Sequence, residues 1–80
     1  MKAINTTEKL GKLIKAKRTF LKVTQKELAL AAGTGLRFII ELERGKETCR
    51  VGKVFDVLQV LGLSLQISGM DGIESGGEIR

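Results

Sequence analysis

The sequence offers the chemistry of charged side chains and little else. It has one cysteine, Cys49, and no histidine. An internal disulfide, a Cys/His metal cluster and catalysis by a histidine base are therefore excluded. Fourteen Lys and Arg stand against nine Asp and Glu, for a net charge of +5. This surplus indicates a polyanionic partner, which is nucleic acid, an anionic membrane surface or an acidic protein.

The positive charge lies in the first 68 residues. Residues 69–80 hold three acids and one Arg, a net of −2, which leaves +7 for residues 1–68. No apolar run reaches the length of a membrane span, and lysines interrupt the N-terminal segment where a signal peptide needs an apolar core. We expect a cytoplasmic protein with one domain, residues 1–68, and a flexible acidic tail, residues 69–80.

Local signals in the domain predict four helices. Thr24 and Glu27 form a capping box, and Asn5 with Glu8 has the same character, so one helix should begin near Thr6 and another directly after Thr24. Glycines follow three of the apolar-periodic segments and should end them, because glycine readily adopts a left-handed backbone. The predicted helices are residues 6–21, 25–32, 35–44 and 50–61, the last three ended by Gly33, Gly45 and Gly62.

Apolar residues recur at helical spacing in each predicted helix and define the expected core. The stripes are Leu10, Leu13, Ile14 and Phe20 or Leu21 in the first helix, Leu28, Ala29 and Ala32 in the second, Ile39 and Leu42 in the third, and Val51, Val54, Phe55, Leu58 and Leu61 in the fourth. Phe38 is expected in the core or in packing between helices, and Cys49 in the core or at its boundary.

The period changes to two after the fourth helix. Leu63, Leu65 and Ile67 alternate with polar residues, which predicts a short strand over residues 63–68 with one apolar face. Everything upstream reads as helical, so this strand has no partner in its own chain, and an unpaired strand edge is a liability. A core this small also leaves oligomerisation as the remaining route to stability.

The second and third helices carry the functional prediction. Two short helices joined by a glycine-containing turn form a helix-turn-helix unit, whose second helix enters the DNA major groove. Arg37 can pair bidentately with guanine, Leu36 or Ile40 can contact a thymine methyl, and Glu41 can accept from cytosine N4 or pair with Arg37 one turn away. The predicted base-reading set on the outer face is Gly35, Leu36, Arg37, Ile40 and Glu41.

Eleven positions of this region resemble the phage-repressor (XRE-type) helix-turn-helix. They are Thr24-Gln25-x-x-Leu28-Ala29-x-x-Ala32-Gly33 and Ile39-x-x-Leu42-Glu43-x-Gly45-Lys46. The resemblance implies an all-α bundle in which Gln25, Arg44, Lys46 and Arg50 contact DNA phosphates. It also implies an internal salt bridge between Arg18 and Glu43.

Residues 8–68 more narrowly resemble the HipB-type antitoxins, including the y4mF-like regulators. The resemblance rests on Arg37-Phe38-Ile39, on residues 41–46, and on Leu58 through Ile67. It implies that Leu63, Leu65 and Ile67 lie in a strand that pairs with its copy across a homodimer. It further implies a repressor that binds a palindromic operator on double-stranded DNA and that partners a HipA-like toxin kinase. Gly35, Ile40 and Glu47 depart from residues common in relatives, so no known operator sequence transfers.

Three alternative functions remain open, and the sequence does not favour them equally. A free-standing prophage-type or restriction–modification controller regulator would have the same fold without a toxin. A basic amphipathic module acting on membranes or on an acidic protein would leave the helix-turn-helix register unexplained. An enzyme is least favoured, because the sequence lacks His, Tyr, Trp and a phosphate-binding glycine loop, and it suggests no cofactor or metal.

Overall fold

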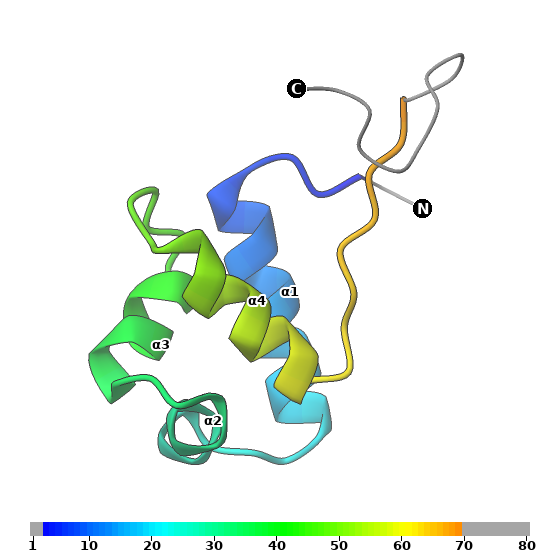
Figure 1. The fold of residues 1–80 in the computed structure, drawn as a ribbon. Coiled ribbons are helices and arrows are strands. Elements are labelled where there is room, and N and C mark those ends of the chain that lie inside the picture. Colours follow the sequence, from blue (N-terminus) through cyan, green and yellow to red (C-terminus); the bar gives the residue numbers. More distant parts are fainter. Residues whose placement is uncertain (1–2, 70–80) are drawn as a thin grey trace.

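The computed structural model describes residues 3–69, which form four helices and no strand. Helix α2 packs against both α3 and α4, and α3 packs against α1. Figure 1 shows α2 and α3 joined by a short turn, with α4 drawn in front of α1 in this view. The predicted all-α class is confirmed. The helices are α1 (Thr7–Phe20), α2 (Gln25–Ala32), α3 (Leu36–Glu43) and α4 (Val51–Val60), each within one residue of its predicted bounds.

Caps define the helix ends. In α2 the capping box is complete, since the Glu27 amide donates to Thr24 Oγ1 at 3.0 Å and the Thr24 amide donates to Glu27 Oε1 at 2.9 Å. The predicted cap of α1 was wrong by one residue. Thr6, not Asn5, is its N-cap and accepts from the Lys9 amide, whereas Asn5 Oδ1 accepts from Lys9 Nζ.

The core is drawn from all four helices. Ile14, Leu28, Ile39 and Val57 are completely buried, one from each helix, so a single residue of every helix meets the others at the centre. Ala29 and Leu42 are buried beside them, and Phe38 and Cys49 pack at the edge as expected. Burial of large aliphatic side chains contributes roughly 1.5–3 kcal/mol each before the entropy cost of folding is subtracted.

Part of the predicted core is on the surface instead. Leu13, Leu21 and Phe55 are exposed, Val51 more so, and Phe20 is 77% exposed. The helical spacing was predicted correctly, but no element within residues 3–69 packs against these apolar side chains. The ring of Phe20 instead lies under Lys17 Nζ, 5.7 Å from its centroid, as a surface cation–π contact.

Helix α1 approaches the end of α3 at backbone distance. Gly11 is buried in α1, and a Cβ built on it would lie 2.5 Å from the Leu42 carbonyl oxygen and 2.6 Å from that of Glu43. One turn earlier, Thr7 Oγ1 donates to the Gly45 carbonyl at 2.7 Å. At Gly11 the two helices meet without an intervening side chain, and the Thr7 hydroxyl also ties the start of α1 to the loop that follows α3.

Residues 63–69 follow α4 as an extended segment that runs past α1 (Figure 1). Leu63 packs against the core, whereas Leu65 and Ile67 are exposed, and no strand pairs with this segment within residues 3–69. The predicted strand across a dimer therefore stays a prediction. Apart from Gly69, the predicted acidic tail lies outside the described residues.

Candidate nucleic-acid interface

The connection between α2 and α3 is a tight turn made by Gly33. Its backbone is left-handed, with φ of 72°, and its amide donates to the carbonyls of Ala29 and Leu30 as α2 ends. The Thr34 amide also donates to the Ala29 carbonyl at 2.9 Å. The small side chain of Ala29 is buried between the helices. The geometry is that of a helix-turn-helix unit with α3 as its second helix.

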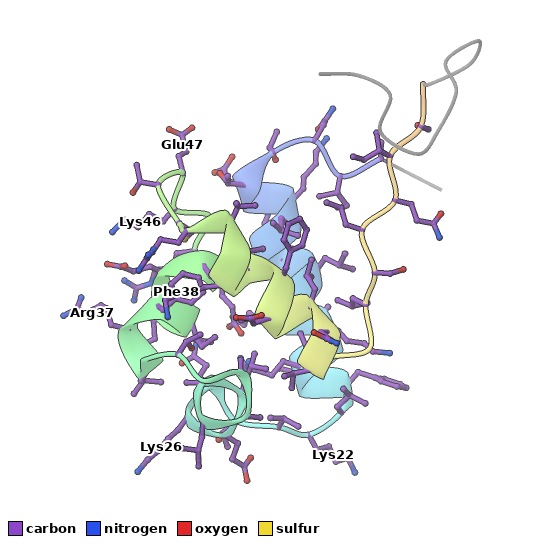
Figure 2. All side chains as sticks on the ribbon, viewed as in Figure 1. Lys22, Lys26, Arg37, Phe38, Lys46 and Glu47 are labelled. Atoms are coloured by element: carbon purple, nitrogen blue, oxygen red, sulfur yellow. The ribbon has the colours of Figure 1, made fainter. Side chains whose placement is uncertain are left out.

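Helix α3 is held from one side only. Ile39, Leu42 and Glu43 are buried, while Arg37 on the opposite side and Leu36 at the N-terminal end of the helix are exposed. Figure 2 shows Arg37 pointing away from the bundle. No acid among residues 3–69 forms an ion pair with Arg37, so its guanidinium is free to donate.

The rest of the predicted base-reading set lies on or beside this face. Gly35 is the N-cap of α3 and provides no side-chain cap, which leaves the first amides of the helix uncovered by protein side chains. Ile40 is half-buried at the margin of the face.

Glu41 is paired with Lys46. Lys46 Nζ lies 3.1 Å from Glu41 Oε1, and the Lys46 amide also donates to the Glu41 carbonyl at 3.1 Å. The alternative in which Glu41 pairs with Arg37 one turn away was wrong, because the loop after α3 brings Lys46 back to this carboxylate. A residue expected to read bases and one expected to bind phosphate are therefore in contact with each other.

A polar cluster of Arg18, Glu43, Gln25 and the Val23 carbonyl lies behind α3. Arg18 Nε lies 2.6 Å from Glu43 Oε2, and its Nη2 lies 3.0 Å from Oε1. Arg18 Nη1 donates to the Val23 carbonyl at 2.8 Å. Arg18 and Glu43 are each 9% exposed. Such a bidentate, buried pair leaves neither charge unpartnered.

Gln25 belongs to this polar cluster as well as to the predicted phosphate contacts. It is the first residue of α2, half-buried, and its Nε2 donates to Glu43 Oε1 at 3.1 Å. Its side chain is therefore tied to the end of α3. This contact could not be predicted from local sequence signals, because Gln25 and Glu43 are 18 positions apart.

The three other predicted phosphate contacts lie along the loop after α3. Arg44 is the C-cap of α3, Arg50 is the N-cap of α4, and both are exposed, as is Lys46 between them. Arg50 makes no side-chain cap, so the positive end of α4 is open beside its guanidinium.

Three comparisons place the chain among known proteins. No family model matches it. It is 48% identical over 66 residues to an uncharacterized HTH-type transcriptional regulator, y4mF, of Sinorhizobium fredii (strain NBRC 101917 / NGR234), covering 82% of this chain and 87% of that protein. The chain belongs to the HTH-type (helix-turn-helix) transcriptional regulators.

Solved structures of HipB agree with this assignment. HipB in a HipA–HipB–O2–O3 complex superposes with a TM-score of 0.78 at 26% identity, covering 85% of this regulator and 96% of that chain. HipB in a complex with an O4 20mer gives the same TM-score, identity and coverage.

The regulator has one exposed cation on this side that the sequence did not single out. Lys26 is the second residue of α2, and Figure 2 shows it projecting from the same side of the molecule as Arg37 and Lys46. Its position directly after Gln25, at the positive end of a helix, was the signal available in the sequence.

Metal ligands, the thiol and the membrane-spanning potential of the helices bear on alternative functions. No cluster of metal-ligating side chains occurs within residues 3–69. Burial raises the pKa of the half-buried Cys49 thiol, which favours the unreactive protonated form. Every helix in the described part of the chain is too short or too polar to serve as a membrane span.

Proposed function

We propose that the regulator is a repressor that reads a palindromic operator as a homodimer, with α3 in the major groove. The observation that carries this proposal is the one-sided bracing of α3, which leaves the unpaired guanidinium of Arg37 directed outward. The HipB structures with O2–O3 and O4 DNA support it at the level of the family. Occupying a promoter would repress transcription by excluding polymerase.

The base-reading residues divide by chemistry. Arg37 donates two hydrogen bonds to guanine, and Leu36 and Ile40 contact thymine methyls. Glu41 accepts from cytosine N4, and Lys46 offsets its charge beside the phosphates. Gly35 allows close approach of the backbone at the start of α3. Phosphate contacts come from Gln25, Lys26, Arg44, Lys46 and Arg50, which fix the orientation of α3 on the duplex.

The homodimer is proposed from the apolar surface that the monomer leaves uncovered. Leu63, Leu65 and Ile67 would pair with their copies as a two-stranded sheet, which would satisfy the free backbone groups of residues 63–68. Exposed side chains on α1 and α4, including Leu13 and Phe55, would be covered in the same dimer. Two α3 helices would then face half-sites about one helical turn or more apart.

A HipA-like toxin is the proposed protein partner. The support is the solved complex of HipA, HipB and O2–O3, whose HipB chain matches 85% of this regulator. A free-standing regulator without a toxin is the alternative. Co-purification of a HipA-like kinase with the tagged regulator from its host would support the antitoxin role, and a lone regulator on its operator would favour the alternative. We propose a cytoplasmic location, where the regulator would meet its operator.

The deciding experiment is footprinting on the regulator's own promoter, followed by titration of the protected duplex. We expect Arg37→Ala to weaken operator binding by about 1–3 kcal/mol per half-site and to leave binding to a mixed-sequence duplex unchanged. Lys12→Ala, on the outer side of α1, is the matched control and should bind as wild type does. Wild-type affinity should fall steeply with salt. Equal operator affinity of Arg37→Ala and wild type would refute the proposal.

A further inference from the structure

The polar cluster behind α3 contains a feature that the salt bridge alone does not explain. Glu43 Oε1 accepts from Arg18 Nη2 at 3.0 Å and also from Gln25 Nε2 at 3.1 Å. One carboxylate thus joins the end of α3 to the first residue of α2. Arg18 balances its charge and also binds the Val23 carbonyl in the α1–α2 connection, so three helices meet at this group.

A carboxylate is only an acceptor, and this fixes the orientation of the Gln25 amide. The amide must turn its NH2 group, and not its carbonyl oxygen, toward Glu43. The second N–H of Nε2 has no acceptor among residues 3–69. An amide that is free to rotate would instead present its carbonyl oxygen half of the time, and that oxygen repels a phosphate.

We propose that Glu43 is a positioning residue for DNA binding, which acts by holding the Gln25 amide with one N–H directed at a backbone phosphate. This inference rests on the proposed DNA binding. Because Arg18 neutralises the carboxylate, Glu43 orients the amide without placing net negative charge beside the duplex. The acidic side chain that braces α3 therefore also determines how α2 meets the phosphate.

The test compares three variants on a 20-base-pair mixed-sequence duplex and on the footprinted operator. Gln25→Ala removes the donor. Arg18→Met with Glu43→Leu removes the acceptor while leaving no charge unpaired, a replacement that folded proteins often tolerate. The triple variant combines them. Circular dichroism melts and sedimentation confirm that each variant is folded and in the same oligomeric state as wild type.

We expect Gln25→Ala and the Arg18/Glu43 pair variant each to weaken binding by about tenfold per subunit, as for a hydrogen bond to a charged group. The triple variant should be weaker than either by no more than about twofold, because one interaction is lost only once. Both duplexes should respond alike, since a phosphate contact carries no sequence information. If Glu43 had only a structural role, the folded pair variant would bind DNA as wild type does. If Glu43 and Gln25 acted independently, the losses of the two variants would multiply in the triple variant. Either result overturns the inference.

A second variant tests the orientation of the amide directly, at a temperature where its melt shows it to be folded, because Glu43→Gln leaves Arg18 without its countercharge. Glu43→Gln keeps the length of the side chain but adds a donor, so it no longer dictates the orientation of the Gln25 amide. We expect a several-fold loss of affinity for both duplexes and loss of the distinct side-chain NH2 resonances of Gln25 in NMR spectra. Wild-type affinity in Glu43→Gln would overturn the inference while leaving DNA binding intact. Absence of wild-type binding to either duplex would overturn both proposals.

Discussion

The buried glycine of α1 gives a prediction that runs against helix propensity. Replacing Gly by Ala inside a helix normally stabilises it by about 1 kcal/mol. At Gly11 the added Cβ would lie 2.5 Å from the Leu42 carbonyl oxygen, 2.6 Å from that of Glu43 and 2.9 Å from the Glu43 carbonyl carbon. All three are backbone atoms, so no side chain can rotate to relieve the contact, and α1 must move away from α3.

Overpacking of this kind costs about 1–3 kcal/mol. We expect a value in the upper part of that range, because moving α1 away also removes the close contacts of Gly11 with the Leu42 and Glu43 carbonyls. After the gain in helix propensity, we expect Gly11→Ala to lower the free energy of unfolding by about 2 kcal/mol. For a domain of this size that corresponds to a fall in Tm of roughly 8–16 °C. The assay is thermal unfolding by circular dichroism at fixed protein concentration, because association would shift Tm.

Gly52 in α4 supplies the matched control. A Cβ there meets no atom within 4 Å, so Gly52→Ala should raise stability by up to about 1 kcal/mol. The two substitutions have the same chemistry and opposite predicted signs. A Gly11→Ala variant that melts at or above wild type would refute the claim that α1 and α3 meet at backbone distance.

Four further predictions concern the capping box, the buried ion pair and the thiol. Thr24→Ala should cost about 0.5–2 kcal/mol in chemical denaturation. Hydrogen bonds from the amide and hydroxyl of Thr24 lower the pKa of Glu27. The ionised Glu27 therefore stabilises the fold fully above the ordinary pKa of glutamate, and this stabilisation is lost as the pH falls through the lowered pKa. The difference in unfolding free energy between wild type and Glu27→Ala should accordingly shrink in acid. Glu43→Ala should cost about 3–5 kcal/mol by leaving Arg18 buried and unpaired, far more than the Arg18→Met, Glu43→Leu pair. Because burial raises its pKa, Cys49 should react with iodoacetamide more slowly in the folded regulator than in denaturant, and an equal rate would contradict its burial.

Local chemistry explains why the helix boundaries could be predicted. The Thr24–Glu27 box and Gly33 act within a few residues of their own positions, so the sequence shows them directly. The exception is also local: Asn5 and Thr6 both qualify as caps, and the choice depended on which side chain reaches the Lys9 amide. The inward pair Ile39 and Leu42 was likewise readable from spacing alone.

Features that depend on distant residues could not be predicted in this way. Spacing marked Phe20 and Val51 as apolar-stripe residues, but it cannot say whether the chain covers a stripe, and here both are exposed. Gln25 was readable as a first-turn residue, whereas its contact with Glu43 depends on how α2 and α3 pack. The Arg18–Glu43 pairing came from family resemblance and not from the pattern of residues.

The division of α3 into two sides has a consequence for how such regulators diversify. The side chains that keep α3 in place, Ile39, Leu42 and Glu43, are different from those proposed to meet the bases. Exchanging Leu36, Arg37, Ile40 and Glu41 therefore changes no fully buried side chain, although Ile40 and Glu41 are half-buried. New operator preferences can therefore arise, or be engineered by grafting these four positions, with little loss of stability. Lys46 should be changed together with Glu41, because the two form an ion pair.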